Sequence, residues 1–215
     1  MTKWINRAVF KMPRNGATTR TVNTSSPTNL TAGAAFTPEA GSLLVAVVYG
    51  GVTTTTPAGW TLPSGGSAVQ NGGLYVFHRV SDGTGTITFT HNADNYPVLV
   101  AVYEFAAGSS FVKAAMAVGV TYDGTNPALA GLTGTNVVMA VKARTVPDAD
   151  PYAYAWTAPT VEDFDVLEAF VATDGYSASL GYVEGFTGAS WTPIATNAVP
   201  SGSYETITFA ILATE

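Results

Sequence analysis

The chain of 215 residues contains no cysteine, two histidines and few charged residues, which make up 11% of the total. Without cysteine, neither a disulfide framework nor a thiolate metal site can form, so the fold must be stable through packing alone. His78 and His91 are the only imidazole bases, and the sequence has no Gly-x-Ser-x-Gly motif to accompany them. These shortages predict a protein with no catalytic residues.

Other absences bear on location and ligands. The first residues, Met1–Asn6, lack the apolar core of a signal peptide, and no apolar run approaches membrane-spanning length. The sequence also lacks a Gly-Lys-Ser/Thr phosphate loop and the acidic alternation around a glycine that marks calcium loops. We therefore expect a protein made in a cytosol, with no membrane contact, no cofactor and no metal.

The residues that are present favour strands. Hydrophobic residues make up 47% of the chain, 22 glycines punctuate it, and no long segment repeats apolar residues at helical spacing. Leu43–Tyr49 is an unbroken apolar run bordered by Gly41 and Gly50, as expected for a strand buried on both faces. In Thr86–Thr90, apolar residues alternate with threonines, which is typical of a strand with one buried face.

Turn signals divide the rest of the chain into further strands. Thr18–Thr37 has weak periodicity and is expected to be an extended connector, and the Trp60 ring is expected to plug the end of the apolar interior. Strands are also predicted at 3–10, 74–80, 98–105, 112–120, 136–141, 176–183 and 206–212.

The later part of the chain repeats the pattern of the earlier part. Asn136–Val141 aligns with Ser42–Val47, and Trp156 then falls near the position of Trp60. Linkers rich in proline, serine or charge are missing between the two parts, which favours a shared core. The sequence predicts an all-β, jelly-roll-like antiparallel β-sandwich. The predicted sandwich domain spans residues 31–215, with related Greek-key halves at about 41–120 and 135–215.

The charges are distributed unevenly. The first twenty residues hold five of the nine Lys and Arg residues and no acid, whereas the net charge of the chain is −6. A basic arm at 1–30 on an acidic body favours docking on a neighbouring protein over binding nucleic acid, because the body would repel phosphate. The alternative is that these charges solvate a leading edge strand. The candidate docking residues are Lys3, Trp4, Arg7, Lys11, Arg14 and Arg20.

Two other groups of side chains are candidates for a site. Glycoside hydrolysis needs two carboxylates that face each other across a cleft. Glu162, Asp163, Asp165 and Glu168 are merely close in sequence, so we interpret them as a solvated acidic loop leading into a strand. Tyr152, Tyr154 and Trp156 alternate along one strand face, which suits stacking on a glycan, although packing in the core is the alternative.

The stretch from Gly41 to Ala106 carries a resemblance. It runs from Leu-Leu-Val-Ala-Val through a threonine-rich loop to Pro-Ala-Gly-Trp-Thr, then Leu-Tyr-Val-Phe-His-Arg-Val and Thr-Ile-Thr-Phe-Thr. This order resembles β-sandwich modules of tailed-phage virion proteins, especially minor tail proteins and head-decoration proteins of phages of actinobacteria. The resemblance is looser over the second half of the chain.

The resemblance implies a non-enzymatic structural subunit of a virion, assembled in the host cytoplasm. Its partners would be other virion proteins and copies of itself, with no direct nucleic-acid contact. The alternative function is a receptor- or glycan-binding module exposed on the phage particle or on a bacterial surface, with a host surface glycan as its partner.

Overall fold

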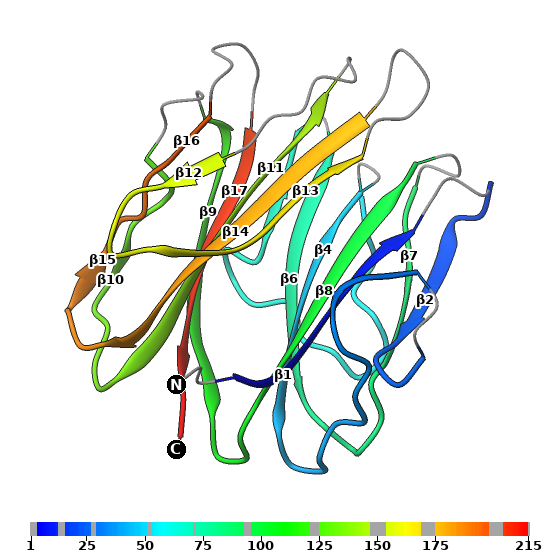
Figure 1. Ribbon diagram of the computed structural model, residues 1–215, viewed down its shortest axis with the longest axis horizontal. Helices are drawn as coiled ribbons and strands as arrows, with labels where there is room; N and C mark the ends of the chain where they lie inside the picture. The colour runs from blue at the N-terminus through cyan, green and yellow to red at the C-terminus, as the bar shows by residue number, and fades with distance from the viewer. Residues whose placement is uncertain are drawn as a thin grey trace.

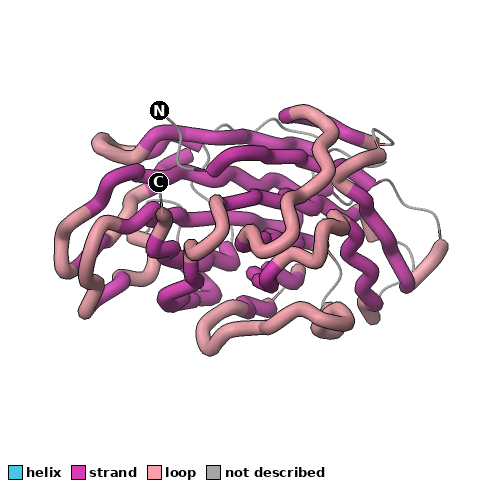
Figure 2. The backbone as a smooth tube through the Cα atoms, turned by 90° about the horizontal axis from the view of Figure 1, so that it is seen from below, coloured by secondary structure: helices cyan, strands magenta, loops and turns pink. Residues whose placement is uncertain are grey.

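Two large antiparallel β-sheets packed face to face form the centre of this computed structural model (Figure 1). The predicted all-β sandwich is therefore confirmed, and Figure 2 shows strands and loops throughout the described chain. The structure describes residues 4–12, 16–26, 29–50, 53–70, 72–92, 96–120, 125–146, 154–168, 175–197 and 204–214. In these ranges, no helix is long and apolar enough to cross a membrane.

The strands fall into two successive series along the chain. The first series is β1 (Trp4–Met12), β2 (Thr19–Asn23), β3 (Leu30–Gly33), β4 (Leu43–Tyr49), β5 (Ser67–Val69), β6 (Gly73–Val80), β7 (Thr86–Thr90) and β8 (Val98–Phe105). The second series is β9 (Ser110–Val120), β10 (Leu129–Ala130), β11 (Asn136–Val146), β12 (Tyr154–Trp156), β13 (Val161–Glu168), β14 (Gly175–Phe186), β15 (Ser190–Trp191), β16 (Ala195–Asn197) and β17 (Tyr204–Leu212).

Each series supplies one large sheet. The first sheet has the order β3-β1-β8-β4-β6-β5, and the second has the order β13-β14-β11-β17-β9. Three small sheets, β2-β7, β10-β15 and β12-β16, cover the outer faces. In Figure 1, β2 and β7 lie to the right of the first sheet, and β10, β12, β15 and β16 lie to the left of the second.

The apolar run at 43–49 is buried on both faces, as predicted, because it lies in the middle of these layers. Val45 and Val47 pack toward the second sheet, against Met139 and Phe209 among others. Alternate residues of the same strand point the other way into a second cluster beneath β2 and β7. A strand with apolar neighbours on both sides has no polar face, which is why its sequence does not alternate.

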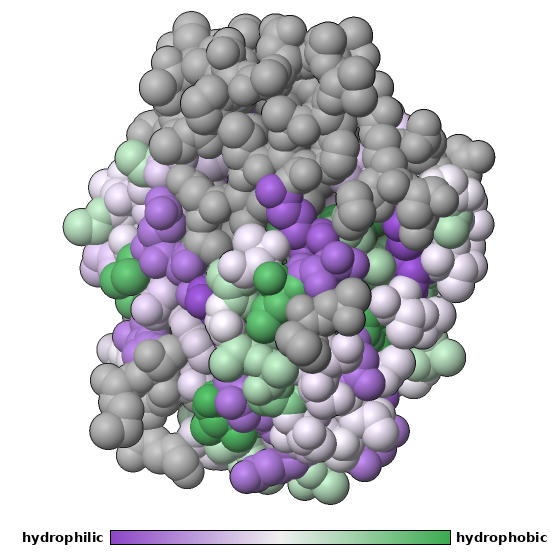
Figure 3. Space-filling view, turned by 45° about the vertical axis from the view of Figure 1, so that its right-hand side comes forward, coloured by the Kyte–Doolittle hydropathy of each residue, from purple (hydrophilic) through white to green (hydrophobic). Residues whose placement is uncertain are grey.

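The β2-β7 pair covers the outer face of the first sheet. Ile87 and Phe89 are buried in the outer cluster, whereas the three threonines of β7 are exposed. Trp60 is 7% exposed and belongs to the same cluster, with the Arg79 guanidinium 5.1 Å from its ring centre. The face seen in Figure 3 combines strongly hydrophilic, weakly polar and scattered apolar residues where it is described.

Three parts of the chain differ from expectation. The interpretation of 1–30 as an arm is wrong for its first strand, since β1 lies inside the first sheet, between β3 and β8. The expected connector at 18–37 contains two strands, β2 and β3, because their backbone groups find partners in β7 and β1. The supposed acidic loop at 162–168 is part of β13, which pairs with β14.

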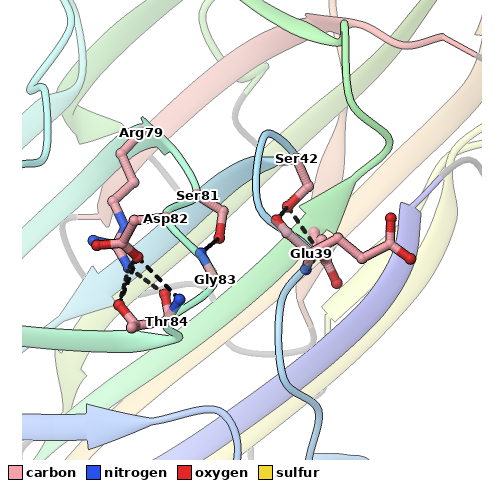
Figure 4. Close-up of polar contacts among 8 residues, drawn as sticks. Glu39, Ser42, Arg79, Ser81, Asp82, Gly83 and Thr84 are labelled. Carbon is pink, nitrogen blue, oxygen red and sulfur yellow. Dashed lines mark hydrogen bonds and ion pairs between the residues drawn. The ribbon is translucent and has the colours of Figure 1, made fainter.

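Short polar turns connect the strands at one end of the first sheet (Figure 4). Asp82 Oδ1 accepts hydrogen bonds from the backbone nitrogen of Thr84 at 2.9 Å and from its hydroxyl at 2.7 Å. The Ser42 hydroxyl donates to the carbonyl of Glu39 at 2.8 Å in the neighbouring connection. These side chains replace water for turn backbone groups, as aspartate and serine commonly do.

Candidate functional site

Two of the predicted docking residues lie at the seam where β1 meets the second sheet. Trp4 is half-buried, with its ring centre 4.5 Å from that of Tyr182 and 5.4 Å from that of Tyr103, edge to face in both cases. Arg7 forms an ion pair with Asp163, whose side chain is 7% exposed. These two residues therefore hold the two sheets together.

A β-bulge positions Asp163 for this role. The register between β13 and β14 shifts between Glu162 and Phe164, so Asp163 is the extra residue of the bulge. Its Oδ2 accepts a hydrogen bond from the Tyr103 hydroxyl at 2.6 Å, and its backbone carbonyl accepts one from Arg7 at 3.2 Å. A carboxylate that sequence reasoning placed on a solvated loop is thus an anchor between the sheets.

The electrostatics of the seam follow from burial and from this carboxylate. Burial acts to lower the pKa of Arg7, but the hydrogen bond and charge of Asp163 outweigh it, so that pKa is raised. Burial raises the pKa of Tyr103 well above its usual value, and the neighbouring Asp163 charge adds to the rise. Both groups therefore keep their protons at neutral pH, and Tyr103 serves as a donor to Asp163.

Of the two other described docking candidates, Arg20 is buried and Lys11 is half-buried. Arg20 is 2% exposed, and its Nε donates to His91 Nε2 at 3.4 Å while its Nη2 donates to the Tyr96 carbonyl at 3.0 Å. Burial lowers the pKa of Arg20 and that of the half-buried Lys11. Of the six predicted docking residues, Lys3 and Arg14 lie outside the described residues.

The two histidines occupy different environments. His78 lies on the inward face of β6, as its alternation with Val76 predicts, and its ring stacks on Phe111 at 4.5 Å. Burial lowers the pKa of His78. His91 is 2% exposed and forms an isolated bridge with Thr54.

Tyr154 and Trp156, two of the three predicted glycan-stacking residues, lie on one face of β12, and both contact β14. Tyr154 is 4% exposed, and its hydroxyl lies 2.8 Å from the Ser177 hydroxyl. Trp156 Nε1 donates to the Ser179 hydroxyl at 2.8 Å, and its ring lies against Gly181. Tyr154 is therefore too buried to stack on a glycan, Trp156 is half-buried, and Tyr152 lies outside the described residues.

A buried cationic cluster lies beneath β12 and β16, and sequence reasoning missed it. Lys142 and Arg144 lie over the ring of Tyr204, at 4.7 Å and 5.4 Å from its centre. Lys142 is fully buried and donates to the Ala195 carbonyl at 3.0 Å. The available signal was the i, i+2 spacing of two cations in a strand, which puts both on one face.

Glu104 is a second buried carboxylate, on the outer face of the first sheet. Its Oε1 accepts hydrogen bonds from the backbone nitrogen of Glu39 at 2.6 Å and from the Ser42 hydroxyl at 2.8 Å. Its Oε2 accepts one from the Asn6 side chain at 2.8 Å. Through these three hydrogen bonds the Glu104 side chain fixes the preceding connection to the sheet.

Two shallow grooves open on the surface. One, of about 150 Å³, lies between the turn at Thr157–Thr160 and the segment Trp191–Ile194. The other, of about 250 Å³, lies between the end of β1, β2 and Asn29. Within the described part of the chain, no cluster of three or more His, Asp or Glu side chains is arranged to hold a metal ion.

Comparisons of the chain with protein-family models, with curated proteins and with solved structures give no match. The function is therefore inferred from the residues themselves.

Proposed function

We propose that this protein is a non-enzymatic structural subunit of a tailed-phage virion, either a minor tail protein or a capsid decoration protein. The observation that carries the proposal is that the buried charged side chains connect parts of the fold. Asp163 and Arg7 join the two sheets, and Glu104 fixes a connection to the first sheet. Charged groups used in this way favour a rigid building block. The resemblance of Gly41–Ala106 to virion modules supports the same function.

Docking on neighbouring virion proteins requires a surface other than the predicted arm. Three apolar side chains of β9 are exposed: Val112 at 40%, Met116 at 42% and Val118 at 42%. They lie along the last strand of the second sheet, where β9 pairs with β17. Exposed apolar residues gathered on one element favour contact with another protein. The chain would join the particle through this strip while the virion assembles in the host cytoplasm.

The test uses the phage that carries the gene. Mass spectrometry of purified particles should find the chain, and a Met116→Asp/Val118→Asp variant should remain folded but drop out of the particles. Val80→Asp is the matched control, since Val80 is 68% exposed on β6 and should not alter incorporation. Particles that lack the wild-type chain, or that incorporate the double variant normally, would refute the proposal.

The second candidate function is binding of a host glycan. The groove beside Thr157 and Thr160 supports it, since hydroxyl groups and the Trp191 side chain line a space of about 150 Å³. A cavity of that size accommodates one small ring. A glycan array should then show binding that Ile194→Trp removes by filling the groove and that Val80→Trp leaves unchanged. An array without a signal would reject this function.

A further inference from the structure

The two large sheets are assembled in the same way from successive parts of the chain. Their main strands, in chain order, are β1, β4, β6 and β8 in the first sheet and β9, β11, β14 and β17 in the second. In both sheets the first of these strands pairs with the last, the last with the second, and the second with the third. Chance rarely produces one connectivity twice in a single chain, which makes a repeated unit the natural explanation.

The smaller strands repeat as well. β2 pairs with β7 over the first sheet, and β10 pairs with β15 over the second. In each sheet, one strand of the pair comes from the chain between the first and second main strands. The other comes from the chain between the third and the last main strands. The third main strand is flanked in both sheets by the strand just before it, which is β5 beside β6 and β13 beside β14. This covered-sheet connectivity is that of a jelly roll.

One bulge in the first main strand of each sheet falls at an equivalent place. A bulge at Ile5 interrupts the pairing of β1 with β8, and a bulge at Val112 interrupts the pairing of β9 with β17. Both bulge residues are exposed, at 45% and 40%. The turns before β5 and β13 also agree. The backbone nitrogen of Trp60 donates to the carbonyl of Pro57, and that of Thr160 donates to the carbonyl of Thr157, each at 3.1 Å. Bulges are specific features of a fold, so this agreement is informative.

The contacts between the sheets are reciprocal. Trp4, at the start of β1, packs on Tyr182 of the second sheet at 4.5 Å. Phe111, at the equivalent place in β9, packs on His78 of the first sheet at 4.5 Å. Tyr182 and His78 are themselves equivalent, because each pairs with the second main strand, at Met139 and Val45. An interface in which residue i meets j and j meets i has two-fold symmetry.

The chain ends are placed as this symmetry requires. Trp4 pairs with Phe105, which directly precedes the connection between β8 and β9. The Thr214 hydroxyl donates to the Ala107 carbonyl of the same connection at 2.9 Å. Both ends therefore meet the link between the halves, close to the axis that would relate them.

We propose that the chain is a covalently joined dimer of two copies of one jelly-roll unit, residues 4–105 and 110–212. The face between the two sheets is then a two-fold interface, and the partner that each unit fits is a second copy of that unit. These boundaries differ from the repeats at 41–120 and 135–215 suggested by the sequence, because β1 and β9 open the units. The inference does not depend on the proposed place in a virion.

Circular permutation of the full chain tests the proposal. Two permutants join Glu215 directly to Met1, one opened between Gly108 and Ser109 and the other between Asp82 and Gly83. The first opening leaves both units continuous, whereas the second divides the first unit between β6 and β7. The midpoint of thermal unfolding should lie within about 3 °C of the wild type for the first permutant. For the second it should be lower by more than about 5 °C.

Equal midpoints for the two permutants, or a lower midpoint for the one opened at Gly108, would overturn the proposal. A crystal structure gives an independent measurement that does not depend on stability. In it, residues 4–105 should superpose on residues 110–212 after a rotation close to 180°. A relation by translation, or the lack of any common superposition, would equally refute the two-fold interface.

Discussion

The outer faces of the two large sheets are covered in different ways. Beneath β2 and β7 the first sheet presents apolar side chains, including Leu44, Val48 and Phe77. Beneath β12 and β16 the second sheet presents buried polar ones. Lys142, Ser177 and Ser179 each bond to the covering strands or their aromatic side chains. The β2-β7 pair is thus attached by apolar burial and the β12-β16 pair by directional bonds, whereas β10 and β15 pack on an apolar cluster that contains Leu129, Val138 and Trp191.

This difference teaches where each half of the chain tolerates change. An apolar contact has no preferred direction, so the first layer accepts substitutions that preserve volume and polarity. A buried polar contact needs its partner at a fixed distance, and losing one partner leaves the other without compensation. Four sets of variants test this contrast and a second one, between the two seams of the sandwich. At one seam β1 meets the second sheet, and at the other β9 meets the first sheet through Phe111 and His78.

The largest effect is expected when a buried valine of the first sheet is replaced by lysine, the residue at the equivalent position of the second sheet. Val48 and Lys142 occupy the same position in the repeated strand order, and both are fully buried. Val48→Lys should cost about 4 kcal/mol or more, because its amine would be buried without an acceptor. Urea unfolding followed by circular dichroism measures the loss.

Two further variants complete that comparison. Lys142→Met should cost about 1–2 kcal/mol, since the Ala195 carbonyl loses its donor while the volume is kept. Val80→Lys, on an exposed side chain, should leave the unfolding midpoint unchanged. A Val48→Lys variant as stable as the wild type would show that the first layer is not the apolar contact described here.

The next effect concerns the two seams between the sheets. The seam at β1 contains the Arg7–Asp163 pair, whereas β9 has Ala114 at the position equivalent to Arg7. Asp163→Asn should cost about 2–3 kcal/mol, because the partly buried Arg7 loses its counter-charge and Tyr103 loses its ionised acceptor. Chemical denaturation at neutral pH gives the value.

A double variant separates the charge from the packing. Arg7→Met combined with Asp163→Asn should recover part of the loss, since no uncompensated cation remains. Asp82→Asn serves as the surface control, because the Asp82 side chain of the Arg79–Asp82 pair is 64% exposed. If both aspartate variants behave alike, the seam at β1 is not an anchor.

A smaller effect is expected from one methyl group under the polar layer. A Cβ at Gly181 would lie 2.5 Å from Trp156 Cδ2 and 2.7 Å from Thr160 Cγ2. Gly181→Ala should therefore cost about 1–3 kcal/mol by forcing the indole outward. Indole fluorescence should shift at the same time, and Trp156→Phe in the same background should restore part of the stability. No change in either measurement would contradict the packing of Trp156 on this glycine.

The smallest effect is a pH dependence of the seam at β9. Burial lowers the pKa of His78, so its folded-state pKa lies below the unfolded value of about 6.5. The unfolded chain then takes up the proton first as the pH falls. The contribution to stability is complete above pH about 6.5 and decreases below it.

His78→Phe should keep the ring stacked on Phe111 and remove this acid-side decrease. The midpoints of urea unfolding at pH 7.5 and pH 5 measure this decrease. Between these two pH values, the His78→Phe variant should lose less stability than the wild type. Tyr182→Phe, at the equivalent position, should leave the acid side unchanged, because the pKa of Tyr182 is raised by burial and nearby acids. An identical acid-side loss in wild type and His78→Phe would contradict this prediction.

Much of the strand pattern follows from sequence because burial on both faces leaves a continuous apolar run. Leu43–Tyr49 and Val98–Tyr103 are such runs, and the strands that contain them, β4 and β8, lie within a residue of the prediction. The expectation failed where a strand depends on a distant partner. β3 is four residues long and half exposed, and it exists because β1 offers it a free edge. No local pattern carries that information.

Candidate sites were harder to predict than strands. Alternation correctly placed Tyr154 and Trp156 on one face of β12, but alternation cannot say which face is covered. Likewise, the basic residues of β1 and β2 suggested an external arm, although Arg7 and Arg20 find their partners inside the fold. Direction and partner are properties of packing, not of spacing.

By itself, the sequence determined the fold class and the main strands of this protein. Absent cysteine, abundant glycine and long apolar runs leave an all-β sandwich as the way to bury a core of this composition. Only the tertiary structure decided that β1 lies within a sheet, that Asp163 points inward and that the two halves share one connectivity. Each of these depends on contacts between residues far apart in the chain, which local propensity does not encode.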